Sequence, residues 1–179
     1  VNIQDAFIQT LFRQQKIKVE YTISNQDKTE KQISIIGAVS PAISPLSEVL
    51  SFNPESVTLK PAERKVVTIE HNWSEPELWS PENPFLYYLK TTLINEAGVA
   101  LDTETRRFGF REIWTEGNEL MFNGHPFTIL GTNIVQHSEF HSTQRYHYMM
   151  PENWNSTIDR LFELKLRTVR FHMQPAPRY

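Results

Sequence analysis

The 179-residue chain has no cysteine, no long apolar run and no excess of basic residues. The lack of cysteine excludes disulfides and cysteine-ligated metals. No apolar stretch approaches the roughly 18 residues that a transmembrane helix needs, which argues against a membrane protein. With 18 basic against 21 acidic residues, the net charge is −3. No basic stripe exists to neutralise phosphates, so we expect binding neither to nucleic acid nor to anionic membranes.

The beginning of the chain also lacks two common features. Val1 is not an initiator methionine, and the segment after it has neither the charged nor the apolar region of a signal peptide. We therefore expect that residue 1 is not the natural start. The missing signal leaves the location unknown, with the cytoplasm and the periplasm both open.

Short runs of alternating apolar and polar residues fill the first part of the chain. Hydrophobic residues make up 39% of the sequence, enough to bury a core. The clearest run is 16–23, where Ile17, Val19, Tyr21 and Ile23 share one face. Further strands are expected at 4–12, 31–39, 48–52, 56–59, 63–71, 85–95 and 99–108. This series of short strands with regular turn signals predicts an immunoglobulin-like sandwich of two antiparallel sheets.

The pattern changes beyond Trp114. Asn123-Gly124 is the strongest short-range signal for a type I′ hairpin. A strand over 127–132, a His-rich loop, a helix over about 152–165 and a strand over 167–171 follow. The apolar residues of the helix fall on one face, and a crossover of this length suits two parallel strands. The second part of the chain is therefore predicted to be a βαβ unit.

Three motifs resemble segments of glycoside hydrolase family 2, which includes β-galactosidases, β-glucuronidases and β-mannosidases. Residues 78–87 (Leu-Trp-Ser-Pro-Glu-Asn-Pro-Phe-Leu-Tyr) are similar to a signature of the family's immunoglobulin-like domain, and 108–112 (Phe-Gly-Phe-Arg-Glu) to the last strand of that domain. Residues 122–126 (Phe-Asn-Gly-His-Pro) with 131–133 (Gly-Thr-Asn) resemble the hairpin and first strand of its catalytic barrel. Three motifs in the family's order make the resemblance specific.

The resemblance implies a mainly β fragment. Residues 1–114 would form the immunoglobulin-like β-sandwich, and 115–179 the first βαβ portion of a TIM (β/α)8 barrel. Retaining glycosidases use two carboxyl groups about 5–5.5 Å apart. In the family both are glutamates at later barrel strands, so we expect no catalytic residue in this chain. The parent protein is expected to be a retaining β-galactosidase-like hydrolase of O-glycosidic bonds in β-glycosides, and this fragment alone to be inactive.

Candidate sugar-binding residues come from strand ends and the loop that follows the first strand, because active sites of such barrels lie at the carboxyl ends of the strands. Asn133 is expected to end the first barrel strand and matches the family's Gly-x-Asn, with loop capping as the alternative. Arg170 resembles a partner of the nucleophile, with a structural ion pair as the alternative. His137, Glu139 and His172 depart from the family pattern and are candidates for substrate contact, with surface loop residues as the alternative.

Three histidines of the loop raise the question of a metal. His137, His141 and His147 have a spacing similar to that of a zinc helix. No glutamate follows His137, however, and the nearby serines favour a loop. We therefore expect no metal and no cofactor.

A second function remains open, namely a non-catalytic immunoglobulin-like module that binds carbohydrate or protein. Its binding platform could be formed by the aromatic residues Trp73, Trp79, Phe85, Tyr87 and Tyr88. Core packing is the favoured role for these rings, since Pro81 and Pro84 hold their loop rigid.

The predicted partners follow from the leading hypothesis. They are a β-glycoside substrate and the remaining domains of the parent enzyme, and a homo-oligomer stays open. Arg111 and Glu112 are expected to bridge the sandwich to the barrel.

Overall fold

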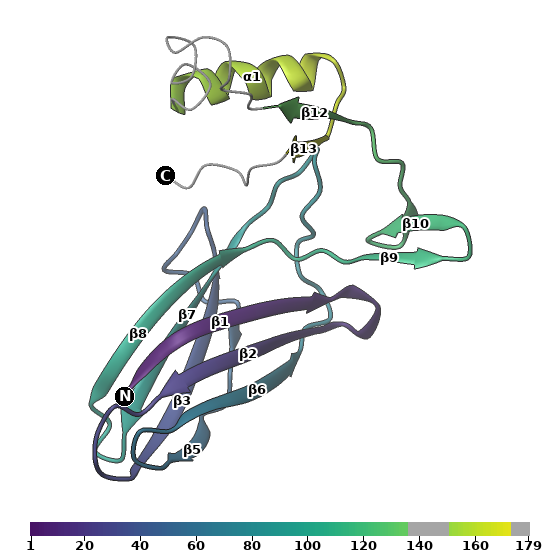
Figure 1. Ribbon diagram of the computed structural model, residues 1–179. Helices are drawn as coiled ribbons and strands as arrows, with labels where there is room; N and C mark the ends of the chain where they lie inside the picture. Colours follow the sequence, from purple (N-terminus) through teal and green to yellow (C-terminus); the bar gives the residue numbers. More distant parts are fainter. Residues whose placement is uncertain (136–150, 173–179) are drawn as a thin grey trace, which may run out of the picture. The chain divides into compact units, whose positions relative to one another are not determined.

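The computed structural model describes residues 1–135 and 151–172, and Figure 1 shows the course of the chain. These residues form, in order, β1 (Asn2–Leu11), the 3-10 turn η1 (Phe12–Gln14), β2 (Lys16–Ser24), β3 (Lys31–Pro41), β4 (Leu50–Ser51), β5 (Glu55–Leu59), β6 (Arg64–Asn72), β7 (Tyr87–Asn95), β8 (Ala100–Phe108), β9 (Ile113–Glu116), β10 (Glu119–Phe122), β11 (His125–Pro126), β12 (Gly131–Val135), α1 (Pro151–Glu163) and β13 (Thr168–His172).

Two antiparallel sheets make up most of the structure. One has the strand order β1-β2-β6, and the other has the order β4-β3-β7-β8, with β5 also paired to β3. In Figure 1, β1, β2 and β6 lie in one layer, and β3, β7 and β8 lie in the other. The alternating pattern of the sequence therefore builds a sandwich of two sheets.

The core lies between the two sheets. β2 contributes Ile17, Val19, Tyr21 and Ile23, all with 0% exposure, which confirms the predicted face. The second sheet contributes residues at alternate positions of β3, β5 and β7, among them Ile33, Ile35, Val39, Val57, Leu59, Leu89 and Leu93. Because successive side chains of a strand point to opposite faces, alternate residues of these strands enter the core and the residues between them point away from it. The structure is mainly β, as expected.

The turns follow the predicted chemistry. Gly98 has φ +75 in the β7–β8 connection, where it closes a turn with Asn95. Asn123 and Gly124, with φ 47 and 86, join β10 to β11, and Phe122 pairs directly with His125. Positive φ at both central residues is the requirement of a type I′ hairpin, so this prediction is confirmed.

The contacts divide the chain into two compact units, Val1–Pro126 and Phe127–Tyr179. The β9–β10–β11 sheet therefore groups with the sandwich, although residues 115–126 were placed with the second domain on sequence grounds. The second unit contains the parallel pair β12–β13 and the helix α1. Parallel pairing was predicted from the crossover length and is confirmed.

Two element boundaries differ from the sequence prediction. Residues 127–130 form no strand, and β12 runs over Gly131–Val135 instead of 127–132. The backbone carbonyl of Leu130 accepts hydrogen bonds from Arg167 N (2.9 Å) and Thr168 N (3.2 Å), and the ladder with β13 starts only after it. Asn133 is therefore the middle residue of its strand and not its end.

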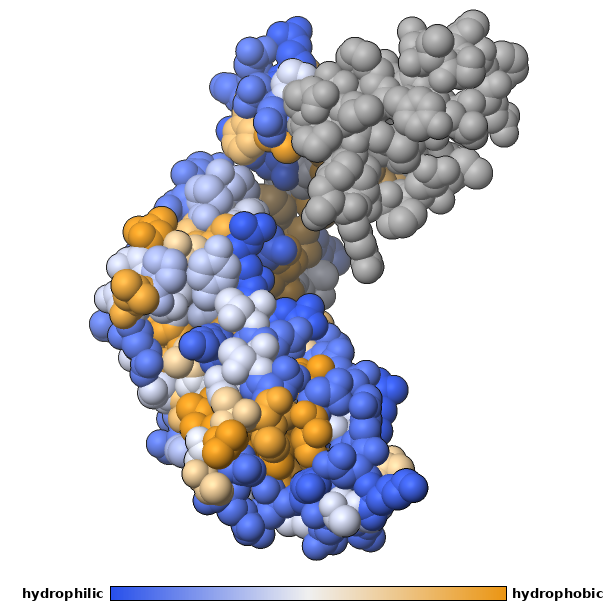
Figure 2. All heavy atoms as spheres, turned by 90° about the vertical axis from the view of Figure 1, so that its left-hand side faces the viewer, coloured by the Kyte–Doolittle hydropathy of each residue, from blue (hydrophilic) through white to orange (hydrophobic). Residues whose placement is uncertain are grey.

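The described surface is polar with apolar patches. Figure 2 shows apolar side chains among polar ones on one face. Exposed apolar residues include Phe7 at 53% and Val66 at 62% of the sandwich, and Phe162 at 49% of α1. Single exposed apolar residues are ordinary on soluble domains. Within the described residues, no helix is long and apolar enough to cross a bilayer.

Candidate functional site

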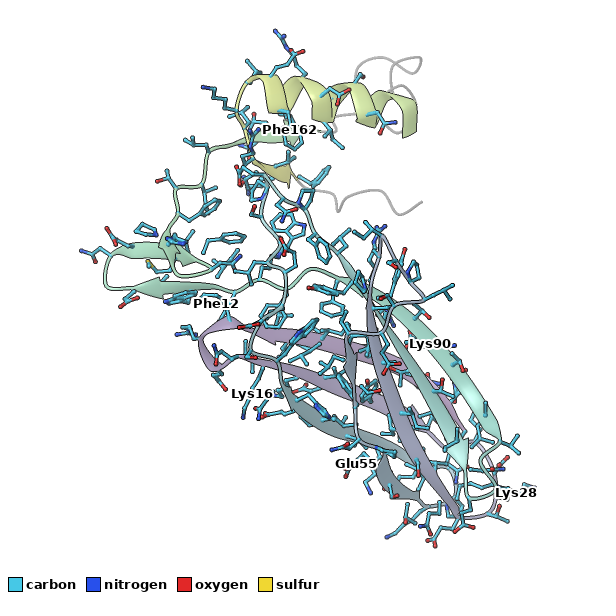
Figure 3. The ribbon with its side chains drawn as sticks, turned by 180° about the vertical axis from the view of Figure 1, so that it is seen from behind. Phe12, Lys16, Lys28, Glu55, Lys90 and Phe162 are labelled. Carbon is cyan, nitrogen blue, oxygen red and sulfur yellow. The ribbon has the colours of Figure 1, made fainter. Side chains whose placement is uncertain are left out.

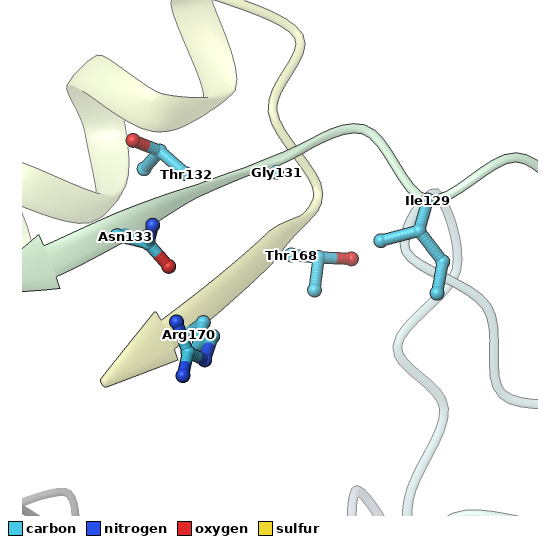
Figure 4. Close-up of a pocket in the computed structure, with 6 residues that line it drawn as sticks. All are labelled: Ile129, Gly131, Thr132, Asn133, Thr168 and Arg170. Atoms are coloured by element: carbon cyan, nitrogen blue, oxygen red, sulfur yellow. The ribbon is translucent and has the colours of Figure 1, made fainter. Parts of the chain in front are cut away.

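The candidate site is built on the parallel pair β12–β13 of the second unit. Gly131 pairs with Thr168, and Asn133 pairs with Arg170. Side chains alternate between the two faces of a strand, so these four residues share one face of the pair. In Figure 4, Thr132 is directed toward α1, whereas Asn133 and Arg170 lie on the side away from the helix.

The end of α1 brings β13 into register with β12. Lys165 has φ 58, and two hydrogen bonds close the helix end, from Lys165 N to Phe162 O and from Leu166 N to Leu161 O, both 2.9 Å. This is the Schellman arrangement, which is most often made by glycine. The chain reverses there, and the amides of the next two residues bind the carbonyl of Leu130. These hydrogen bonds fix the first pair of the ladder, Gly131 with Thr168.

An open hollow of about 210 Å³ lies on this pair of strands. Asn133 and Arg170, both candidates from the sequence, are among its lining residues. Their side chains are exposed to solvent within the described part of the chain. The complete lining is Ile129, Gly131, Thr132, Asn133, Thr168 and Arg170.

Gly131 lets the two strands approach closely at one end of the hollow. A Cβ added there would lie 2.5 Å from the backbone oxygen of Thr168 and 2.9 Å from the Cβ of Thr168. Real Cβ atoms do not come this near to backbone oxygen, so only glycine fits without moving a strand. A glycine inside a strand often marks such an approach.

The hollow carries a positive charge and several hydrogen-bond donors. Arg170 takes part in none of the ion pairs found among the described residues. Its guanidinium group is cationic and offers a planar fork of N–H donors. The amide of Asn133 adds both a donor and an acceptor, and Thr168 adds a hydroxyl group. The arrangement suits a carboxylate or the hydroxyl groups of a sugar.

The other sequence candidates are described only in part. His172 is the last residue of β13 and pairs with Val135 in the ladder, two positions beyond Arg170. His137 and Glu139 lie outside the described residues, as do His141 and His147. Where the chain is described, no three His, Asp or Glu residues are grouped so that they could hold a metal ion.

The aromatic residues of the sandwich pack against one another. Trp73 is 9% exposed and meets the rings of Tyr87, Phe108 and Phe110 edge-on, at centroid distances of 4.8, 6.4 and 5.3 Å. The guanidinium of Arg111 covers the ring of Trp79 at 4.4 Å. A sugar stacks only on a free ring face; Trp73 is buried among other rings, and Arg111 covers one face of Trp79. Burial also raises the pKa of Tyr87, whose hydroxyl accepts a hydrogen bond from Glu77 N.

Four lining residues were absent from the sequence candidates, namely Ile129, Gly131, Thr132 and Thr168. Only Gly131 had a readable signal, since an isolated glycine at a strand suggests close backbone approach. Thr132 and Thr168 are ordinary strand residues, and Ile129 precedes β12. The place of the two threonines in the hollow follows from the register of β12 against β13.

One curated relative is the β-galactosidase of Pseudoalteromonas haloplanktis, which is 26% identical over 170 residues. The match covers 92% of this chain but only 15% of that protein. The chain thus spans less than a sixth of the length of this relative.

Solved structures share the fold of nearly the whole chain. A family 2 glycosyl hydrolase from Bacteroides cellulosilyticus matches 97% of this chain and 24% of its own length, with a TM-score of 0.79 and 19% identity. A β-galacturonidase from Eisenbergiella tayi bound to galacturonate matches 97% and 29%, with a TM-score of 0.74 and 22% identity. β-Glucuronidase 2 of Bacteroides uniformis matches 96% of this chain and 20% of its own length, with a TM-score of 0.73 and 21% identity.

The family comparison concerns the sandwich. Residues 1–111 match the model of the glycosyl hydrolases family 2. This stretch is more than half of the 179 residues. It contains the motif at 78–87 and ends within the motif at 108–112. The chain belongs to the glycosyl hydrolases family 2.

Proposed function

We propose that this chain is part of a retaining glycoside hydrolase that cleaves O-glycosidic bonds in β-glycosides, in the manner of a β-galactosidase. Its partners are then the β-glycoside substrate and the remaining domains of the same polypeptide. The catalytic glutamates lie in those remaining domains, and the fragment alone has no hydrolytic activity. Support comes from the family to which the chain belongs, since its relatives include a β-galactosidase, a β-glucuronidase and a β-galacturonidase.

The two units have separate roles in this proposal. The sandwich, with strand orders β1-β2-β6 and β4-β3-β7-β8, is an immunoglobulin-like scaffold. The second unit is the beginning of a (β/α)8 barrel, with β12 and β13 as its first two strands and α1 as the crossover between them. A parallel pair joined through a helix is the repeating unit of such a barrel. Solved family 2 structures match both parts of this chain together.

The observation that carries the proposal is the pairing of Asn133 with Arg170 on the strand face away from α1. In a barrel this face is the interior, where substrates bind near the carboxyl ends of the strands. Arg170 would hold a carboxylate, which offsets the cost of enclosing its charge. Asn133 would bind sugar hydroxyl groups or brace that carboxylate. His137 and Glu139, which come shortly after β12 in the sequence, and His172, which ends β13, remain proposed substrate contacts.

The test uses the full-length protein with nitrophenyl β-galactoside, β-glucuronide and β-galacturonide as substrates. We expect hydrolysis of at least the first, with retention of the anomeric configuration seen by NMR. Arg170→Ala and Asn133→Ala should lower kcat/KM by roughly 100-fold, the typical loss when one polar group of an active site is removed. Asp159→Asn, on the exposed surface of α1, is the matched control and should have no effect.

Two results would overturn the proposal. One is an inverted product, because inverting enzymes need a water between their carboxyl groups and a wider separation. The other is a full-length protein that hydrolyses none of the three substrates while it is folded.

A further inference from the structure

The junction between the β9–β10–β11 sheet and the sandwich contains a buried polar side chain, Asn123. This residue is 7% exposed. Its Oδ1 accepts a hydrogen bond from Glu112 N (2.9 Å), its Nδ2 donates to the carbonyl of Trp79 (3.0 Å), and its own N–H donates to Glu112 O (3.0 Å). One side chain thus joins the hairpin turn to two other segments of the first unit.

Both segments are in turn fixed to the sandwich. Trp79 N donates to Phe110 O at 2.9 Å, and Leu78 bridges to the same residue. Glu112, with its side chain 13% exposed, accepts hydrogen bonds from Arg13 Nε (2.8 Å), Nη2 (2.5 Å) and N (3.0 Å). Arg13 belongs to η1, between the first two strands of the sandwich.

Aromatic contacts strengthen the same junction. Phe12 stacks on Trp114 of β9 at 6.4 Å, and the guanidinium of Arg13 covers that indole ring at 4.7 Å. Figure 3 shows Phe12 beside the β9–β10–β11 sheet. A Cβ added to Gly124 would lie 3.2 Å from the ring of Phe12, so the turn itself also packs there. Glu112, expected together with Arg111 to bridge the two domains, makes these contacts within the first unit.

We propose that Asn123 is a positioning residue that locks the β9–β10–β11 sheet onto the sandwich and so fixes the point at which the chain leaves the first unit, just after Pro126. The part of this inference that concerns catalysis rests on the proposed function. A sheet of four-residue and two-residue strands has little core of its own, so it holds its place through the polar lock. The segment that leads to Asn133 then starts from a defined position. Small misplacements far from the chemistry can lower the rate strongly, because catalysis depends on near-ideal geometry.

The decisive variant is Asn123→Gly. Glycine tolerates the positive φ at this position, so the change removes the side-chain hydrogen bonds without straining the turn. Asn118→Gly, in the exposed β9–β10 turn of the same sheet, is the matched control. Asn123→Asp keeps the acceptor for Glu112 N but sets a carboxylate oxygen against Trp79 O in place of the donor, so its effect should be no smaller than that of Asn123→Gly.

The first measurement is amide hydrogen exchange on the 179-residue chain. In Asn123→Gly, the amides of Glu112 and of residues 119–123 should exchange roughly 10-fold faster, as expected from the loss of two hydrogen bonds. Amides of β2 and β7 should be unchanged, and Asn118→Gly should resemble the wild type. Unchanged exchange over 112–126 would overturn the lock. Loss of protection in β2 as well would show a general structural role and also overturn it.

The second measurement is steady-state kinetics of the full-length protein. We expect kcat for Asn123→Gly to fall roughly 10-fold with KM within twofold, since sugar contacts remain but the geometry of the reacting groups is disturbed. Normal kcat despite faster exchange would overturn the positioning role. If the wild-type protein is inactive, the proposed function fails, and the exchange experiment alone decides whether the lock exists.

Discussion

Asn133 lies directly opposite Arg170 in the parallel ladder, and both residues line one hollow on the second unit. This relationship places an amide beside a guanidinium that has no acidic partner among the described residues. Exposed polar groups on the face of this pair away from α1 serve no packing purpose. The proposed function therefore uses these two residues.

Arg170→Lys separates charge from geometry at this position. Lysine keeps the positive charge but lacks the planar fork that binds a carboxylate with two hydrogen bonds. We expect kcat/KM of the full-length protein to fall roughly 10-fold, less than for Arg170→Ala. Kinetics of the two variants side by side provide the check. Equal activity of the lysine variant and the wild type would mean that charge alone is needed.

Gly131→Ala should destabilise the β12–β13 pair. The added methyl group would lie 2.5 Å from the carbonyl oxygen of Thr168, and backbone cannot move aside cheaply. We expect a cost of about 1–3 kcal/mol, typical of overpacking, measured as faster exchange of the β12 and β13 amides. The comparison is Gly37→Ala, where the methyl group meets the ring of Phe52. Its effect should appear in β3 and leave the second unit unchanged.

The Arg13–Glu112 pair makes stability depend on pH. Burial by itself would raise the pKa of Glu112, but the hydrogen bonds and charge of Arg13 outweigh it and hold that pKa below its ordinary value of 4.5. The stabilisation is therefore present above pH 4.5 and is lost as the pH falls through the lowered pKa of the folded state. Denaturant unfolding of the wild type and Arg13→Ala should differ by about 1 kcal/mol at pH 7. The difference should shrink toward pH 3, and a constant difference would exclude this linkage.

The hydroxyl group of Tyr21 should lose its proton only at unusually high pH. Burial raises its pKa to about 12, against an ordinary value of 10.0, although its hydrogen bond with Thr91 acts in the opposite direction. The folded protein favours the neutral hydroxyl of Tyr21. The contribution of this group to folding stability is therefore complete below pH 10 and is lost as the pH approaches 12. An absorbance titration of tyrosinate should contain a component near pH 12 that disappears in Tyr21→Phe, while the raised pKa of Tyr87 stays. If the variant has the same titration curve as the wild type, Tyr21 is not shielded in solution.

The two units should differ in protection against hydrogen exchange. β2 is buried at alternate positions in a two-sheet core, whereas β12 and β13 form a two-stranded sheet beside a helix with Ile158 at 44% and Phe162 at 49% exposure. A two-stranded sheet is only marginally stable by itself. In the 179-residue chain we expect the amides of β12 and β13 to exchange much faster than those of β2. Equal protection of both units would contradict this expectation.

Local signals in the sequence were sufficient for several elements. The alternation of Ile17, Val19, Tyr21 and Ile23 predicted a buried face because strand side chains have a period of two. Asn123-Gly124 predicted its turn because few residues tolerate positive φ. The strand predicted at 127–132 lies at Gly131–Val135 instead. An apolar run in the sequence does not show at which residue pairing with the neighbouring strand begins. The carbonyl of Leu130 accepts hydrogen bonds from the amides of Arg167 and Thr168, which follow α1 in the sequence, and this sets where the pairing begins.

For the candidate site too, some features can be read from the sequence and others only from the tertiary structure. The sequence by itself determined the family motifs, and with them Asn133 and Arg170 as residues of interest, because their identities stand in recognisable local patterns. Only the tertiary structure decided that these two residues are direct neighbours, that Gly131 and Thr168 share their face, and that Asn123 joins three segments of the first unit. These are contacts between segments far apart in the chain. They depend on register and on the way a helix ends, and no local pattern encodes either.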